Sequence, residues 1–290
     1  MKKTDVQPFF VIPVILVVAA LMALAGSQHG ESVGGIRVFA LCAIIAFAIQ
    51  FVVFIPAYLA RTDRFFDLTG SSTYITVSVV ALIATQRWDA RSVIITTLIV
   101  VWAMRLGSFL FRRATRSGGD RRFDSIRGHF PSFLMTWTLQ GLWVLLTAGA
   151  GLAAITTAEP KALNWIAFVG IGLWTVGFLI EAVADAQKHS FRNDPANEKR
   201  FIRSGLWAWS RHPNYFGEIV IWAGIAVIAA PALTGWQWAT MVSPLFVIIL
   251  LTRVSGIPML ERKAHRTWGD DPDYREYRAK TPVLIPRPPR

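Results

Sequence analysis

The sequence predicts an all-α polytopic integral membrane protein with about eight transmembrane helices. Hydrophobic residues make up 53% of the 290 residues, and the mean hydropathy is +0.44. They gather in blocks close to the roughly 20 residues that a helix needs to cross a bilayer, whereas a soluble core would scatter them in shorter periodic runs. No Pro/Gly/Ser-rich linker separates the blocks, which favours one polytopic domain.

Six or seven apolar blocks are clear along the chain. They cover Phe9–Ala25, Ile36–Leu59, Val93–Phe111, Phe133–Thr157, Ala162–Val183, Tyr215–Ala230 and Trp236–Val254. The first block is too long for a removable signal peptide and lacks a small-residue cleavage site, so we expect a retained helix. A weaker span, Thr73–Thr85, reaches membrane length only if it begins near Asp67 and its polar residues face a protected interior.

The distribution of charge predicts the orientation in the membrane. The net charge is +12, and the bases collect in Lys2-Lys3, Arg61–Arg64, Arg112–Arg127, Lys188–Arg211 and the tail after Arg253. With about eight spans these segments all lie on one side, and the opposite loops hold few charges, with Arg87 and Arg91 as exceptions. The positive-inside rule therefore places both termini in the cytoplasm. Because the charge follows the membrane topology, we do not expect nucleic acid as a partner.

The cysteine and histidine residues do not indicate a metal centre. Cys42 is the single cysteine and lies inside an apolar block, which excludes an internal disulfide and a multi-cysteine metal site. None of the five histidines has the HExxH spacing of a zinc enzyme. We therefore expect no metal cofactor.

A polar stripe ends the block that starts near Ala162. Glu181, Asp185, Lys188 and Arg192 recur every three to four residues, so they share one face of a helix that leaves the membrane. One interpretation is an exposed helix end with i, i+4 ion pairs. The other is a ligand site in which the two bases hold phosphates and an acidic residue accepts hydrogen bonds from ribose or amide groups. The depth of Glu181 favours the second.

The densest polar segment, Ser204–Glu218, stands immediately before the next apolar block. Polar side chains at a helix entrance in a membrane usually face a ligand or a water-filled cavity. Trp207 and Tyr215 offer rings that could stack on a base. Asn214 and Glu218, one helical turn apart, could hold a carboxamide or a ribose. This segment therefore predicts a cofactor site.

Three runs together carry a family resemblance. They are Gln187-Lys188-His189-Ser190-Phe191-Arg192-Asn193, Ser204-Gly205-Leu206-Trp207 and Arg211-His212-Pro213-Asn214-Tyr215-Phe216-Gly217-Glu218. The chain is similar to the C-terminal domain of the steroid 5-alpha-reductase family, whose members include bacterial membrane proteins, and to the sterol delta-14 and delta-7 reductases. The resemblance suggests N-terminal transmembrane helices in residues 1–60, and a reductase-like membrane domain of seven helices in residues 61–290.

The resemblance implies an NADPH-dependent enzyme of the bacterial inner membrane that reduces an activated C=C bond. The substrate would be a 3-oxo-delta-4 steroid or another lipophilic enone that enters from the bilayer, and hydride would reach its β-carbon. No obligate protein partner is expected. The NADPH site would lie within residues 181–277, and Arg105 is a further candidate. The implied cofactor-binding residues are Arg105, Glu181, Asp185, Lys188, Arg192, Lys199, Arg200, Trp207, Arg211, His212, Asn214, Tyr215, Glu218, Glu261, Tyr274 and Tyr277.

The same resemblance suggests catalytic residues near the weak span. A carboxylate at the start of the corresponding helix works with a tyrosine in the family, and Asp67 matches that carboxylate by span order. A helix N-cap is the alternative role for Asp67. The tyrosine position holds Trp102, whose indole N–H can donate a hydrogen bond but cannot deliver a proton. Tyr74 is the expected substitute, and Arg105 is expected to pair with Asp67 or with the nucleotide.

Two other functions fit part of the sequence. Isoprenylcysteine-type carboxyl methyltransferases, which use S-adenosylmethionine, share an Arg-His-Pro-x-Tyr-x-Gly run, but their cofactor has no phosphates to explain the bases of Lys188–Arg211. A non-enzymatic transporter or lipid-binding protein would bind neither cofactor and would line a pathway with Arg105 and Glu181. The closing segment Pro282–Arg290 is expected to be an exposed tail.

Overall fold

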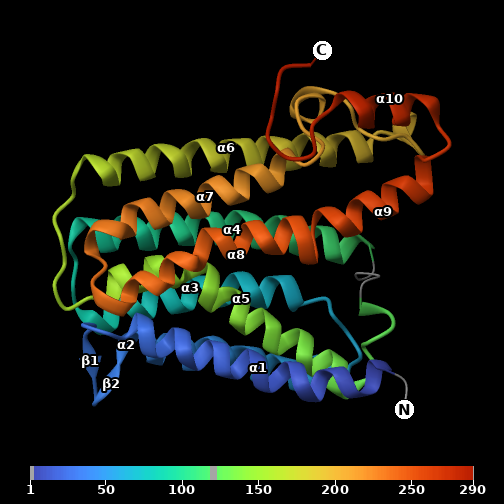
Figure 1. Cartoon of the computed structure of the whole chain (residues 1–290). Coiled ribbons are helices and arrows are strands. Elements are labelled where there is room, and N and C mark those ends of the chain that lie inside the picture. Colours follow the sequence, from blue (N-terminus) through green and yellow to red (C-terminus); the bar gives the residue numbers. More distant parts are fainter. Residues whose placement is uncertain (1–2, 118–122, 290) are drawn as a thin grey trace. The chain divides into compact units, whose positions relative to one another are not determined.

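The computed structural model describes residues 3–117 and 123–289, which form helices joined by loops and one short hairpin (Figure 1). The long helices are α1 Lys3–Gly26, α2 Val38–Leu59, α3 Phe66–Thr85, α4 Ala90–Ser117, α5 Phe130–Thr156, α6 Trp165–Asn193, α7 Pro213–Ala229, α8 Val242–Ile249, α9 Ile257–Trp268 and α10 Pro272–Lys280. The hairpin pairs β1 Ser32–Val33 with β2 Ile36–Arg37. Single helical turns and short segments are η2 Pro195–Asn197, η3 Gly205–Ala208, η4 Ala230–Ala232, η5 Gly235–Met241 and the π-helical η6 Leu250–Val254.

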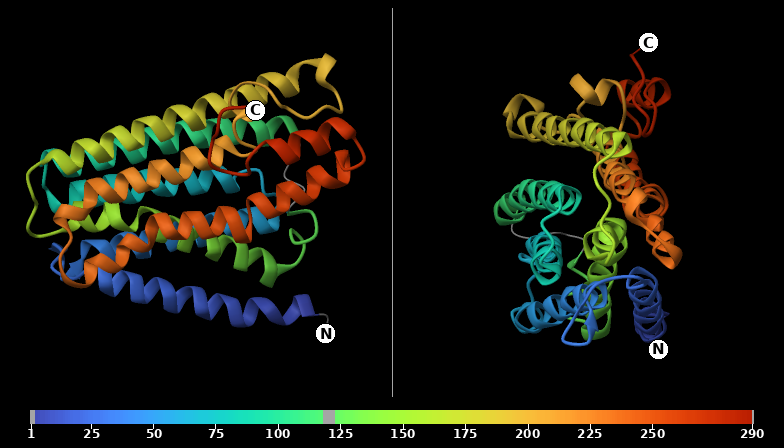
Figure 2. Two further views of the ribbon diagram at one scale, coloured as in Figure 1. Left: turned by 45° about the horizontal axis from the view of Figure 1, so that its top comes forward. Right: turned by 90° about the vertical axis from the view of Figure 1, so that its left-hand side faces the viewer.

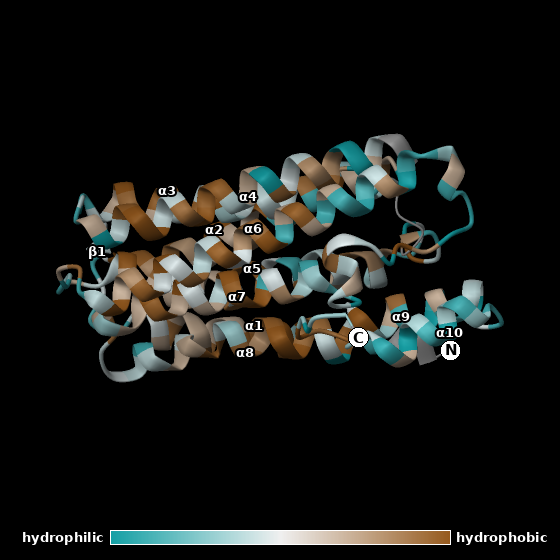
Figure 3. Cartoon of the chain, turned by 90° about the horizontal axis from the view of Figure 1, so that it is seen from above, coloured by the Kyte–Doolittle hydropathy of each residue, from teal (hydrophilic) through white to brown (hydrophobic). Residues whose placement is uncertain are grey.

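The all-α membrane fold is confirmed. Within the described residues, eight helical segments are long and apolar enough to cross a membrane. The weak span becomes the 20-residue helix α3, because its polar residues Thr69, Ser71, Thr73 and Ser78 are buried in protein rather than exposed to lipid. In Figure 3 α9 and α10 are largely hydrophilic.

The last apolar block, Trp236–Val254, is not one continuous α-helix. It is built from η5, α8 and η6, and the candidate span continues through α9 to Trp268. Thr234 and Gln237 form a capping box at the start of η5, which satisfies backbone N–H groups that a membrane cannot hydrate.

Two compact units divide the chain. Unit one consists of Met1–Ala167 and Ala226–Ser243, and unit two of Phe168–Ile225 and Pro244–Arg290. These units do not follow the expected division by family resemblance at residue 60, which concerns similarity to relatives and stays a prediction.

Helix α5 is the centre of unit one. It contacts α1, α2, α3 and α4, and the blue α1 runs beside it in the views of Figure 2. Every residue from Val144 to Thr156 is buried. Many of these residues are Ala or Gly, which let neighbouring helices approach closely where no hydrophobic effect drives helices together.

Arg87 and Arg91, the two exceptions to the predicted charge asymmetry, both have hydrogen-bond partners within unit one. Arg87 forms an ion pair with Glu31. Arg91 is only 1% exposed, and its guanidinium donates to the carbonyl oxygens of Lys161 (3.2 Å), Ala162 (2.7 Å) and Ile228. A cation at such carbonyls complements their partial negative charge. These two bases therefore hold the fold together and are not free surface charges.

In unit two, α6 and α7 cross at paired glycines. A Cβ on Gly217 would lie 2.7 Å from the carbonyl oxygen of Gly177, and a Cβ on Gly224 would lie 2.7 Å from that of Gly170. The earlier glycine of α6, Gly170, meets the later glycine of α7, Gly224, so the two helices are antiparallel. Small residues spaced by seven allow this close backbone approach. The crossing brings the end of α6 against the start of α7, where the predicted cofactor residues lie.

Candidate active site

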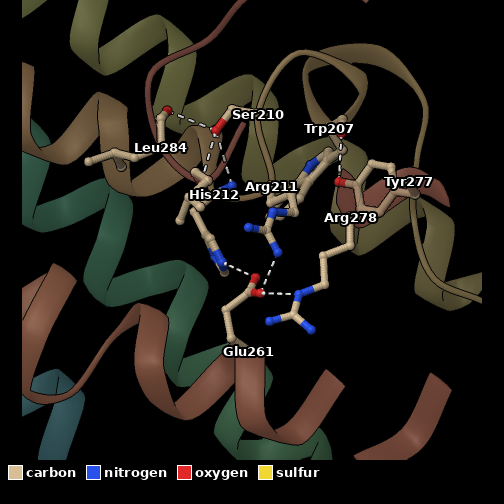
Figure 4. Close-up of polar contacts among 9 residues, drawn as sticks. Trp207, Ser210, Arg211, His212, Glu261, Tyr277, Arg278 and Leu284 are labelled. Atoms are coloured by element: carbon tan, nitrogen blue, oxygen red, sulfur yellow. Dashed lines mark hydrogen bonds and ion pairs between the residues drawn. The ribbon is translucent and has the colours of Figure 1, made fainter. Parts of the chain in front are cut away.

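Glu261 on α9 is the acceptor on which several groups of unit two converge (Figure 4). Its Oε1 accepts a hydrogen bond from Nε2 of His212 at 2.9 Å. Its Oε2 pairs with Nη1 of Arg211 and lies 3.6 Å from Nε of Arg278 on α10. Residues about 50 positions apart thus meet at one carboxylate. The resemblance implied Arg211, His212 and Glu261 as neighbours of one ligand, and the structure brings these three together.

Burial favours the neutral form of His212. It is 5% exposed, and burial lowers its pKa, although the hydrogen bond and charge of Glu261 act in the opposite direction. Its ring stacks on Tyr215, with centroids 5.7 Å apart. Among the described residues, Nδ1 of His212 and Nε of Arg211 have no hydrogen-bond partner although both atoms are buried. Unpaired polar atoms in such a position fit a ligand that supplies a donor and an acceptor.

Ser210 connects this cluster to the C-terminal segment (Figure 4). Its buried hydroxyl donates to the carbonyl oxygen of Leu284 at 2.8 Å and accepts from the N–H of His212 at 3.1 Å. The N–H of Arg211 donates to Pro282, and the N–H of Arg287 donates to Trp209. Val283, Ile285 and residues 287–289 are exposed, as expected for the closing segment, but backbone groups of Pro282, Leu284 and Arg287 are hydrogen-bonded to residues 209–211.

The polar stripe of α6 meets the start of α7. Nδ2 of Asn214 donates to Oδ1 of Asp185 at 3.3 Å. Asp185 and Glu181 are buried, and a Cβ on Gly217 would lie 2.7 Å from the backbone nitrogen of Glu181. An exposed helix end is therefore excluded for these two acids. Glu218, one turn after Asn214, is partly buried.

Trp207 is enclosed by protein. It is 2% exposed, its indole N–H donates to the carbonyl of Ala184 at 3.0 Å, and Nζ of Lys188 lies 4.1 Å from the ring centroid. The hydroxyl of Tyr277 donates to the carbonyl of Trp207 at 2.7 Å, and burial raises the pKa of Tyr277. In this structure Trp207 packs η3 onto α6, and its stacking on a nucleotide stays a prediction.

The remaining bases of the predicted set lie on the surface of unit two. Arg192, Lys199 and Arg200 are exposed. Lys199 has a left-handed backbone with φ of 63°, and its carbonyl accepts from the indole N–H of Trp268 at 2.6 Å. Nearby, Phe201 packs against Tyr274 and Tyr277 with centroids 5.2 and 5.4 Å apart. These contacts fasten the basic loop to α9 and α10, so the loop cations are presented on an anchored segment.

The candidate catalytic residues lie on α3 and α4 in unit one. Tyr74 and Trp102 are buried and their rings meet edge to face, with centroids 5.1 Å apart. Oδ2 of Asp67 lies 4.0 Å from Nη2 of Arg113. The N-cap of α3 is Phe65, so the alternative role of Asp67 as the N-cap is wrong. Arg105, one turn beyond Trp102, is partly buried, and its expected pairing stays a prediction.

Sequence reasoning missed several residues of unit two. Arg278 joins Glu261 but resembles an ordinary surface base, and Ser210 is a small polar residue whose partners are backbone carbonyls. The glycines were detectable in principle, because Gly170 and Gly177, like Gly217 and Gly224, are seven positions apart.

Comparison with known proteins assigns the chain to a family. A family model described as "Protein of unknown function (DUF1295)" matches residues 53–281, most of the sequence. The chain belongs to the DUF1295 family. No solved structure matches this DUF1295 protein.

Curated relatives of this DUF1295 chain confirm the resemblance to the steroid 5-alpha-reductase family. The chain is 28% identical over 166 residues to 3-oxo-5-alpha-steroid 4-dehydrogenase 1 of Rattus norvegicus, covering 56% of this chain and 58% of the relative. The Bos taurus protein of that name is 29% identical, with coverages of 56% and 59%. The very-long-chain enoyl-CoA reductase of Dictyostelium discoideum is 30% identical over 74 residues, 26% of this chain and 24% of that protein. The chain thus spans less than two thirds of the length of these relatives.

Proposed function

We propose that this protein is an NADPH-dependent membrane reductase of an activated C=C bond in a lipophilic substrate. The observation that carries the proposal is the convergence of Arg211, His212 and Arg278 on Glu261, beside the Asp185–Asn214 contact. These residues belong to the segments that resemble the reductases. The relatives include a steroid dehydrogenase and an enoyl-CoA reductase, and their names support the same reaction class.

The residues of unit two fit the chemistry of a phosphorylated dinucleotide. Arg192, Lys199 and Arg200 are exposed cations on or beside an anchored loop. Lys188 and Arg211 lie close enough to His212 to interact with it electrostatically. Guanidinium and ammonium groups bind phosphates with charge-assisted hydrogen bonds. Asn214 and Asp185 would hold amide or ribose groups, and Nδ1 of His212 would accept a hydrogen bond. Bound NADPH supplies hydride for the β-carbon of a conjugated alkene.

Tyr74, Trp102 and Asp67 would act on the substrate. The hydroxyl of Tyr74 would donate a hydrogen bond to the carbonyl oxygen of an enone and stabilise the negative charge that develops there, and the indole N–H of Trp102 would be a second donor. Asp67, in the first turn of α3, would work with them to polarise that carbonyl, and the α-carbon would then take a proton. Loss of one such donor costs about 3 kcal/mol, so Tyr74→Phe should lower turnover on the order of a hundredfold.

Purified protein in nanodiscs tests the proposal directly. We expect oxidation of NADPH with at least one member of a panel of steroid, sterol and prenyl enones. We also expect NADPH, but not S-adenosylmethionine, to raise the melting temperature, because specific binding adds about 2.7 kcal/mol at a hundredfold excess over Kd. Stabilisation by S-adenosylmethionine alone would favour a methyltransferase. An effect of neither cofactor would favour a transporter or lipid-binding protein.

A pair of charge variants tests the cofactor site. Lys188→Gln with Arg192→Gln should weaken NADPH binding at least tenfold, because each charge-assisted contact contributes about 1.5–3 kcal/mol. Arg262→Gln with Lys263→Gln is the matched control, since it removes two exposed charges from α9 in the same unit. Equal affinities of the two double variants, measured by calorimetry, would count against this site.

A further inference from the structure

Unit one contains a cavity between the C-terminal end of α1 and the β1–β2 hairpin. Its volume is about 690 Å³, which is within the range of about 300–1,000 Å³ that is usual for small-molecule sites. Leu21 and Leu24 of α1 form its apolar side, and Ser27, His29, Arg37 and Trp236 form its polar side. No residue among the described ones that line it is acidic. The cavity is therefore amphipathic. Among the described residues that line it, Arg37 alone carries a permanent charge, and that charge is positive.

Exposed tryptophans indicate that the polar side of the cavity lies at headgroup depth. Trp236 is 71% exposed, and Trp88, Trp165 and Trp238 are also exposed. All four belong to unit one and lie in or beside connections between apolar helices of the chain. Exposed indoles at helix ends are typical of the membrane interface. Leu24, within the candidate membrane span of α1, is 72% exposed and offers apolar surface beside the polar groups.

Several polar groups are available to an anion. One Nη of Arg37 donates to the carbonyl of Gly30, and a guanidinium has five N–H donors in all. The hydroxyl oxygen of Ser27 is buried and has no hydrogen-bond partner within the described residues. His29 has a φ of 53°, a left-handed conformation that is uncommon outside glycine and is often retained at binding sites.

The polar side of the cavity is held in place by the surrounding backbone. The N–H of Glu31 donates to the carbonyl of Thr156 at 2.7 Å, and the N–H of Ala158 donates to the carbonyl of His29 at 2.8 Å. The N–H of Trp236 donates to Oε1 of Gln28. A site whose groups are already ordered loses less entropy when a ligand binds.

We propose that this cavity binds an anionic phospholipid. Arg37, Ser27 and His29 would hold the phosphate, and one acyl chain would run along Leu21 and Leu24. A free phosphate would satisfy the polar groups but would leave the apolar side empty. The positive charge of Arg37 without an acidic neighbour in the lining favours an anionic headgroup over a zwitterionic one. This site is independent of the proposed reductase chemistry.

Native mass spectrometry with lipid titration tests the site on the full-length protein. We expect one dioleoyl phosphatidylglycerol per chain to bind more tightly than dioleoyl phosphatidylcholine. Arg37→Gln should weaken phosphatidylglycerol binding roughly fivefold, the effect of about 1 kcal/mol per cation near a lipid surface. Leu24→Ser, at an exposed position, should weaken both lipids, and it serves as a second variant if Arg37→Gln disturbs the hairpin.

Lys161→Gln is the matched control, because Lys161 is an exposed base in another connection of unit one and lies outside the cavity lining. It should leave lipid binding unchanged. Unchanged phosphatidylglycerol affinity in both Arg37→Gln and Leu24→Ser would overturn the proposal, as would equal weakening by Lys161→Gln. Competition by glycerol 3-phosphate at the same concentration as the lipid would overturn the assignment to a lipid.

Discussion

Glu261 and Arg91 show two ways in which this chain accommodates charge in or beside membrane-spanning helices. Glu261 is surrounded by Arg211, Arg278 and His212, so its carboxylate has charged and neutral donors. The guanidinium of Arg91 donates instead to three backbone carbonyl oxygens. A buried charge is costly unless it is paired or fully hydrogen-bonded. Both residues are therefore expected to be sensitive to substitution.

The first residue-scale prediction concerns His212 and pH. Burial holds the pKa of His212 below its usual value in the folded protein. As the pH falls below about 6.5, the unfolded chain therefore binds a proton before the folded protein does, and the folded protein loses stability. His212→Gln keeps a donor for Glu261 but does not titrate. The melting temperature of the wild type should fall more than that of His212→Gln between about pH 7.5 and 5.5. Parallel curves would show that His212 does not contribute.

The second residue-scale prediction concerns Arg91. Arg91→Ala removes three hydrogen bonds from buried carbonyls and should lower the free energy of unfolding by about 3 kcal/mol or more. Arg87→Gln is the control, because the partly exposed Arg87–Glu31 pair contributes at most about 1 kcal/mol. Thermal unfolding in detergent would measure both. Similar losses in the two variants would contradict the role given to Arg91.

At the scale of elements, the crossing of α6 and α7 determines where the cofactor candidates meet. Gly217→Ala should lower stability by roughly 1–2 kcal/mol, because its Cβ would meet rigid backbone atoms of α6 at 2.7 Å. Gly172→Ala, on the same helix pair, has no atom within 4 Å of the new Cβ. It should match or exceed the wild type, since Ala is the better helix former. Thermal melts that rank the two variants in the opposite order would exclude a tight crossing.

A further element-scale prediction concerns the C-terminal segment. Ser210→Ala removes the hydroxyl that joins Leu284 to His212, so residues 281–289 should open more often. Hydrogen exchange of a peptide from this segment should become faster, by about the fivefold to tenfold that corresponds to one lost hydrogen bond. Ser190→Ala, at an exposed serine of α6, should leave exchange unchanged. Unaltered exchange in Ser210→Ala would mean that the backbone pairs hold the segment alone.

For the whole molecule, the testable property is orientation. Cys42 is buried, so introduced cysteines can be labelled against a low background. If both termini are cytoplasmic, Lys161→Cys should react with an impermeant maleimide in intact cells, and Arg266→Cys only after the inner membrane is opened. The reverse pattern would invert the topology and would place the Glu261 cluster away from cytoplasmic NADPH.

The sequence was sufficient for the properties that each segment carries by itself. Hydropathy and block length predicted the eight spans, including α3, because the requirement to cross a bilayer acts on each helix separately. The spacing of Glu181, Asp185 and Lys188 predicted one face of α6. The similarity of Arg211–Glu218 to the reductases indicated residues that meet in unit two, because those positions are adjacent in the sequence.

Only the tertiary structure decided which distant groups pair. Arg278 reaches Glu261, residues 282–287 pair with residues 209–211, and Arg91 binds carbonyls from two other segments. Backbone carbonyls and N–H groups occur at nearly every residue, so their partners leave no mark in the sequence. Composition therefore determined that this chain forms membrane helices. The way those helices pack determined which carboxylates, cations and backbone groups lie within reach of one another.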